Sequence, residues 1–195
     1  MSDATNNAGR RKHSRGYLPH FDVNGTIQFV TFRLADSMPQ ELLEKWQHEL
    51  ENGLIEDVDL RKRVERYLDS GYGSCFLLDR RIAAELKETL LKWNGERYNL
   101  IAWVIMPNHA HILIELLGVY ALSDIMHSIK SYTAHKANKV LDRRGRFWSV
   151  ESYDRYIRDA NHFHNTIKYI EQNPVKARLC RNADDWEFSS GYRSS

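Results

Sequence analysis

The chain has 195 residues, of which 42% are hydrophobic and 28% are charged, and its formal net charge is +2. A chain of this length can bury the core of a single domain without disulfides or a structural metal. Its longest apolar runs are much shorter than the ~20 residues that cross a bilayer, and its two cysteines match no CxxC pattern. These facts exclude a membrane-spanning helix and a cysteine-based zinc site.

The first half of the chain is expected to hold a tail, one strand and three helices. Residues 1–16 are polar and basic without periodicity, so we expect a disordered basic tail before a single domain at 17–195. The tail lacks the apolar stretch of a secretory signal, which predicts a cytoplasmic protein. Residues of β-branched and aromatic type predict the strand, and apolar residues at helical spacing predict the helices. These segments are the strand 26–34 and the helices 40–51, 59–69 and 80–93.

A tight hairpin is predicted in the middle of the chain. The apolar segments 99–106 and 109–116 both have the pattern of strands. Only Pro107 and Asn108 separate them, which is the spacing of a two-residue turn.

The elements after this hairpin complete the predicted fold class. A long basic helix is expected at 121–142, and an irregular or extended stretch at 146–157. The last helix is predicted at 160–173, because the residue before Pro174 tends to avoid helical geometry. The order of elements predicts an α+β fold, an antiparallel sheet with helices packed on one face.

Positive charge is concentrated in two parts of the sequence. Residues 125–146 hold six Lys or Arg and one acid, and the N-terminal tail is also basic. This uneven distribution favours a polyanionic partner, although a solvated helix face with a solubilising tail is the open alternative. We predict DNA-backbone contacts by Arg10, Arg11, Lys12, Arg15, Lys130, Lys136, Lys139 and Arg143.

Two histidines at the start of the second hairpin strand are candidate metal ligands. Side chains two residues apart on a strand point the same way, so His109 and His111 stand side by side. Imidazole nitrogen binds many transition metals. A second pair, His162 and His164, lies in a predicted helix, where a two-residue step turns the rings apart. Buried histidines bonded to the backbone remain the alternative for the strand pair.

Tyr169 is a candidate nucleophile on the polar side of the last helix. Phe163, Ile167 and Ile170 mark the core face of that helix. Tyr169 lies nearly opposite Ile167, and Asn173 follows one turn later on the side of Tyr169. A phenol has a pKa near ~10 and needs a polarised electrophile, which a metal bound to a phosphate oxygen would supply. An exposed tyrosine without a function is the alternative.

Five segments carry a more specific pattern: AWVIMPNHAHIL, SIKSYTAHKAN, FWSVESYDRYIRDANHF, YIEQNPVKARL and DWEFSS. With them the chain resembles the REP-associated tyrosine transposases, a branch of the single-tyrosine HUH transposases. The resemblance runs from about Gly16 to Ser190. It departs from the family pattern where Arg178 replaces a frequent glycine, and where the segment 53–78 is longer than in compact members.

The resemblance implies a ferredoxin-like α+β fold and a site built from four residues. The HUH pair falls on His109 and His111, the catalytic tyrosine on Tyr169, and the third metal contact on Asn173. It implies Mg²⁺ or Mn²⁺ as the cofactor, and cleavage of single-stranded DNA that leaves a 5′-phosphotyrosine and a free 3′-hydroxyl. The implied partners are single-stranded DNA and DNA hairpins of repetitive extragenic elements, and no membrane is implied. The implied protein is associated with the nucleoid and is a monomer or a homodimer.

Other functions remain open at the level of sequence. A protein of the same fold that binds DNA hairpins without cutting them is the first alternative. A metal-dependent phosphoesterase that uses water in place of Tyr169 is the second. A small-molecule enzyme is disfavoured, because the sequence has no glycine-rich nucleotide loop.

Overall fold

The computed structural model describes residues 12–14, 19–21 and 25–194. Most of the predicted tail therefore lies outside the described residues. The part that is described, Lys12–Ser14, forms strand β1, which pairs antiparallel with β2 (Pro19–Phe21). In the described residues, no helix has the length and the apolar composition needed to traverse a bilayer.

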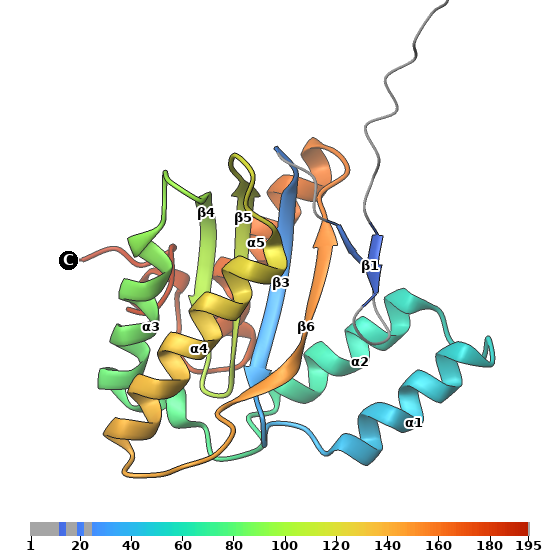
Figure 1. The fold of residues 1–195 in the computed structure, drawn as a ribbon, viewed down its shortest axis with the longest axis horizontal. Coiled ribbons are helices and arrows are strands. Elements are labelled where there is room, and N and C mark those ends of the chain that lie inside the picture. Colours follow the sequence, from blue (N-terminus) through green and yellow to red (C-terminus); the bar gives the residue numbers. More distant parts are fainter. Residues whose placement is uncertain (1–11, 15–18, 22–24, 195) are drawn as a thin grey trace, which may run out of the picture.

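The centre of the molecule is a four-stranded antiparallel sheet with the strand order β4-β5-β3-β6 (Figure 1). The two inner strands, β5 and β3, are almost entirely buried. The segment expected to be irregular or extended forms the edge strand β6 next to β3. The strand bounds are Ile27–Leu34 for β3, Tyr98–Ile105 for β4, His109–Leu116 for β5 and Trp148–Tyr156 for β6.

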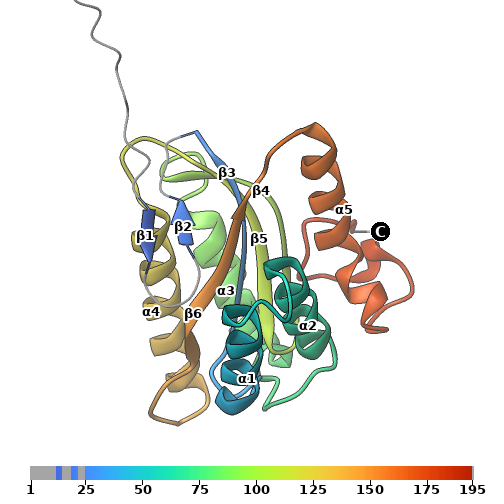
Figure 2. The same cartoon turned by 90° about the vertical axis from the view of Figure 1, so that its right-hand side faces the viewer.

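Helices cover both faces of this sheet (Figure 2). On one face, the largest apolar cluster joins the sheet to α3 and α4. On the other face, α5 packs over a smaller cluster, and α2 packs with α1 against Tyr153 of β6. The α+β class is confirmed, but the expectation of helices on one face only is wrong, because each face of the sheet carries buried apolar residues that helices cover. The helices are α1 (Gln40–Glu51), α2 (Asp57–Asp69), α3 (Arg80–Lys92), α4 (Leu122–Val140) and α5 (Ala160–Lys176), with short 3₁₀ turns at Phe76–Leu78 and Ala183–Asp185.

The last helix is longer than the sequence predicts. Helix α5 continues through Pro174 to Lys176, instead of ending at Asn173. Proline lacks an N–H group and disfavours helical geometry at the preceding residue, but this is a preference and not a prohibition. Asn173 and Pro174 are both buried, and α5 packs along β4. Tertiary packing therefore outweighs the local cost of the proline.

The turn between β4 and β5 is anchored by its own backbone. The Met106 amide donates to the His109 carbonyl at 2.8 Å, which closes the predicted hairpin. The carbonyl of Pro107 accepts from the Leu77 amide, and that of Asn108 accepts from the Leu34 amide. Because both turn carbonyls are used, the start of β5 has a fixed position relative to β3 and to the loop after α2.

Candidate active site

The first histidine of β5 is held in one tautomer by the residue before it. The Asn108 side-chain amide donates to the carbonyls of Leu68 and Tyr72, at 3.2 and 2.8 Å. These two bonds occupy its N–H groups, so its oxygen accepts a hydrogen bond from His109 Nδ1 at 2.7 Å. His109 Nε2 is then left with a free lone pair, the state in which imidazole binds a metal.

The second histidine is oriented from the neighbouring strand. His111 Nδ1 lies 2.8 Å from the Thr31 hydroxyl of β3, and both residues are buried. Its Nε2 lies 3.1 Å from His109 Nε2. Burial lowers the pKa of each ring well below the ordinary value, so both imidazoles are neutral at physiological pH. The structure thus brings the two predicted histidines together, with two uncharged Nε2 atoms meeting at one point.

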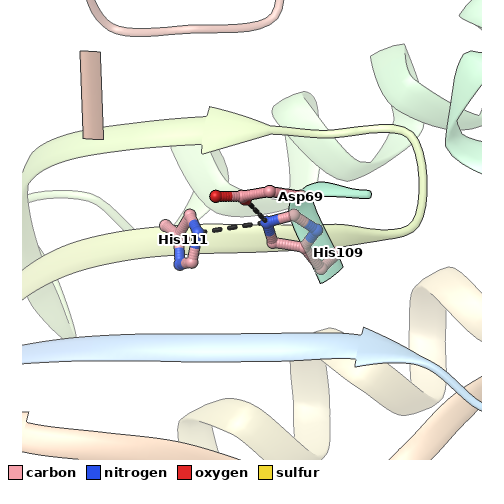
Figure 3. A group of neighbouring side chains, drawn as sticks. All are labelled: Asp69, His109 and His111. Atoms are coloured by element: carbon pink, nitrogen blue, oxygen red, sulfur yellow. Dashed lines mark hydrogen bonds and ion pairs between the residues drawn. The ribbon is translucent and has the colours of Figure 1, made fainter. Parts of the chain in front are cut away.

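Asp69 joins this pair from the last residue of α2, as Figure 3 shows. Its Oδ1 lies 3.7 Å from His109 Nε2, and one ligating atom from each of the three residues falls within 4.8 Å of the others. That oxygen is buried and has no hydrogen-bond partner among residues 12–14, 19–21 and 25–194. Burial, and then the negative charge of Glu65, raise the Asp69 pKa to about 6. Sequence reasoning missed Asp69, because nothing in its helical pattern distinguishes it from a surface acid.

The donor set fits a divalent cation. Adjacent ligand atoms about 2.1 Å from one octahedral ion are about 3.0 Å apart, close to the observed Nε2–Nε2 distance of 3.1 Å. A buried carboxylate oxygen without a partner would gain its missing interaction from such an ion. Two imidazoles and one carboxylate suit Mn²⁺ and related ions as well as Mg²⁺.

Tyr169 of α5 lies directly beside the histidine pair. Its ring centroid is 5.5 Å from that of His111 and 5.9 Å from that of Phe29, with edge-on geometry in both contacts. Its hydroxyl is buried without a hydrogen bond of normal geometry, although the Glu65 carboxylate of α2 interacts with it electrostatically. Burial, and then the charges of Glu65 and Asp69, raise the phenol pKa far above its ordinary value. A phenol whose pKa is raised in this way is a weak nucleophile unless a nearby cation stabilises its oxyanion.

Asn173 lies one helical turn after Tyr169 and is completely buried. Neither its amide nitrogen nor its amide oxygen has a hydrogen-bond partner among the described residues. A buried amide without partners costs about 1–3 kcal/mol, and a role as a metal ligand would explain its presence at this position.

The face of α5 that carries these residues was predicted wrongly. Tyr169 and Asn173 were expected to turn away from the core, but they face the sheet, and Thr166 on the same side is 2% exposed. Ile167 is only partly buried. The reason is that the sheet beneath this helix presents the histidine face of β5, which accepts polar side chains.

One predicted DNA contact on α4 is already engaged inside the protein. Lys130 lines a groove of about 440 Å³ between α4 and β6. Its ammonium donates to the Val150 carbonyl at 2.8 Å and to the Ser152 hydroxyl at 3.3 Å. Burial lowers the Lys130 pKa to about 8. Lys130 therefore joins α4 to β6, whatever its contact with DNA.

Three other predicted DNA contacts lie on α4 or in the loop that follows it. Lys136 Nζ is 3.6 Å from Glu85, and the Arg143 guanidinium lies over the Phe76 ring, whereas Lys139 is exposed. They belong to α4 and the loop after it, and α4 packs on the sheet face opposite to Tyr169. Of the tail residues, Lys12 belongs to β1, and Arg10, Arg11 and Arg15 lie outside the described residues.

Comparison with known proteins places the chain in a family. Its residues 76–173, half of the chain, match the family model described as "Transposase IS200 like". A solved REP-associated tyrosine transposase, determined bound to a REP hairpin, has a similar fold. It is 20% identical with a TM-score of 0.56, over 92% of this chain and 82% of the other. A candidate transposase from Deinococcus radiodurans R1 is 15% identical with a TM-score of 0.39, over 84% of this chain and 98% of the other.

The search of curated proteins found no match. The family model spans both histidines, Tyr169 and Asn173, and its match rests on sequence alone. The fold of the hairpin-bound transposase agrees with it independently. The chain therefore belongs to the family of IS200-like transposases.

Proposed function

We propose that this protein cuts single-stranded DNA next to a hairpin, with Tyr169 as the nucleophile and a divalent metal on His109 and His111. The observation that carries the proposal is the edge contact of the Tyr169 ring with His111, at a centroid distance of 5.5 Å. It unites the candidate nucleophile with the point where two neutral imidazole nitrogens meet. A tyrosine that served only to fill the core would not need a pair of histidines beside it.

The reaction is a transfer of a phosphodiester to a phenol. The Tyr169 oxygen bonds to phosphorus, the bond from phosphorus to the 3′-oxygen breaks, and the 5′ end of the DNA stays linked to the protein. The phenol loses one proton and the departing 3′-oxygen takes one up, so the step is balanced. The Glu65 carboxylate, which interacts with the phenol, is placed to accept the first proton.

The metal would be held by His109, His111 and Asn173, with Asp69 as an added ligand. A bound Mg²⁺ or Mn²⁺ supplies a Lewis acid for a phosphate oxygen. The side chains around it do the positioning: Asn108 and Thr31 fix the two rings, and α5 holds Tyr169 against His111. Such preorganisation is what in-line attack requires.

The DNA would contact two sides of the sheet. The basic residues of α4 and the nucleophile lie on opposite faces. One DNA molecule must therefore pass round an edge of the sheet to touch both. We propose that a hairpin binds the α4 side through its phosphates, while the adjoining single strand reaches Tyr169.

Covalent trapping tests the proposal. The protein is incubated with Mn²⁺ and labelled single strands that carry a palindromic hairpin, and adducts that survive denaturation are counted. We expect an adduct with the wild type and with Tyr192→Phe, a partly exposed control tyrosine. We expect none with Tyr169→Phe, which should still bind the hairpin.

Two outcomes would contradict this function. An adduct formed by Tyr169→Phe would assign the nucleophile to another residue. Hairpin binding by the wild type without any adduct, across Mg²⁺ and Mn²⁺, would identify a binding protein that has lost cleavage.

A further inference from the structure

Two cationic side chains flank the candidate nucleophile from different elements. Lys176, the last residue of α5, has its ammonium 4.6 Å from the centroid of the Tyr169 ring. Arg155 of β6 has its guanidinium 4.8 Å from the centroid of the Phe29 ring. Phe29 itself stacks on His111 at 5.3 Å and meets the edge of Tyr169. Each of the two cations therefore contacts one ring of the cluster that Phe29, His111 and Tyr169 form.

Arg155 has an unsatisfied donor next to this cluster. Its Nε is buried and has no hydrogen-bond partner within the part of the chain that the structure describes. Its charge acts on Glu65, His111 and Tyr169, so it lies within electrostatic reach of the candidate nucleophile and of one candidate metal ligand. A buried guanidinium nitrogen without an acceptor is costly, and an incoming oxygen anion would satisfy it.

Lys176 is accessible from solvent. The residue is exposed while its ammonium covers the phenol ring. Its charge acts on His111, Glu65 and Asp69, the same groups that surround the candidate metal. Lys176 can therefore meet a ligand that approaches Tyr169 from outside.

The charges of the site leave room for an anion. The charged side chains that act on Tyr169 or on its neighbours include two carboxylates, Glu65 and Asp69, and two cations, Arg155 and Lys176. A divalent ion would then add two uncompensated positive charges. A phosphodiester carries one negative charge, and the negative charge on its oxygens is stabilised most by preorganised cations during transfer.

We propose that Arg155 and Lys176 together form a binding site for the scissile phosphodiester beside Tyr169. This inference rests on the proposed function and deepens it, by naming side chains that hold the substrate phosphate in addition to the metal. Glu65 is the opposing charge in the same site and weakens phosphate binding.

The test measures phosphate binding without cleavage. Dimethyl phosphate, a phosphodiester monoanion, is titrated against the Mn²⁺-loaded protein, and binding near the ion is followed by ³¹P relaxation. We expect Lys176→Met and Arg155→Met each to weaken binding by about tenfold, the loss of one charge-assisted hydrogen bond. Lys176→Arg should keep the affinity within about threefold, and Glu65→Gln should raise it, a change of sign that a structural role would not produce.

The controls separate this inference from the proposed cleavage. Lys168→Met removes an exposed lysine of the same helix and should leave phosphate binding unchanged. Because Lys176 is exposed, its variant should stay folded even if Arg155→Met does not, which thermal unfolding checks. Unchanged binding in Lys176→Met, or no binding near Mn²⁺ in the wild type, would overturn the inference. If phosphate binding changes among the variants as expected but Tyr169 forms no adduct with DNA, only the proposed cleavage is refuted. If Tyr169 forms the adduct but Lys176→Met binds dimethyl phosphate as well as the wild type, only the phosphate site is refuted.

Discussion

Thr31→Val removes one hydrogen bond from the candidate metal site and little else. The hydroxyl of Thr31 bonds His111 Nδ1 at 2.8 Å, and the two residues are 3% and 0% exposed. Valine has nearly the same shape, so packing is retained while His111 loses the partner that orients its ring. We expect two separate effects, one on folding and one on metal binding.

The size of each effect follows from the burial of the pair. Loss of a buried hydrogen bond that leaves the imidazole nitrogen unsatisfied should lower the free energy of unfolding by about 1–3 kcal/mol without metal. Loss of a partner that orients a metal-binding histidine should weaken Mn²⁺ affinity by about 10- to 100-fold. At saturating ion the stabilisation by Mn²⁺ should then fall by about 1.4–2.7 kcal/mol.

Thr133→Val is the matched control for this experiment. Thr133 is also 3% exposed and accepts a hydrogen bond from Trp148 Nε1 at 2.9 Å, but it lies on the opposite side of the sheet, in α4. Urea unfolding with and without Mn²⁺, together with calorimetric titration of Mn²⁺, measures both variants. Equal Mn²⁺ affinity of folded Thr31→Val and the wild type would refute the reasoning, as would an equal loss of affinity in Thr133→Val.

Three further predictions concern single residues. Asn173→Leu replaces a buried amide whose atoms have no partner among the described residues. Without added metal it should raise the free energy of unfolding by about 1–3 kcal/mol, and it should abolish stabilisation by Mn²⁺. A lower free energy of unfolding in urea without added metal would contradict this. Arg178 follows α5 with φ of +59°, so Arg178→Gly should add about 1 kcal/mol and raise Tm by about 2–4 °C in calorimetry, while Arg178→Ala should give no gain. Lys130 has its pKa lowered to about 8 by burial, so the unfolded chain holds this proton more tightly than the folded one. The wild type should therefore gain about 1–2 kcal/mol relative to Lys130→Met between pH 8 and pH 10, measured by urea unfolding, and a constant difference would refute the shift.

The sequence predicted the elements that depend on local pattern. Apolar residues at helical spacing located α1 over Gln40–Glu51, and alternation along β5 separated the histidine face from the core face. The two-residue turn at Pro107 and Asn108 predicted the β4–β5 hairpin. The predicted end of α5 was wrong, because burial of Asn173 and Pro174 overrides the local preference of the residue before a proline.

Some residues of the candidate site were predicted from the sequence, and others were found only in the structure. The pairing of His109 with His111 follows from the two-residue period of a strand, and helix geometry related Tyr169 to Asn173. The role of Asn173 as a metal contact came from the family resemblance. Glu65 and Asp69 could not be found in this way, because they lie in a helix whose pattern explains only Leu60, Val64 and Leu68.

Sequence alone therefore determined which residues share a face of each strand and helix, because the side-chain periods of strands and helices are properties of the local backbone. Only the tertiary structure decided which elements meet. It placed α5 against the histidine face of β5 and brought α2 over the same point. The physical reason is that these contacts join residues 40 to 140 positions apart in the chain, and their distance depends on how the whole sheet and its two helical layers pack.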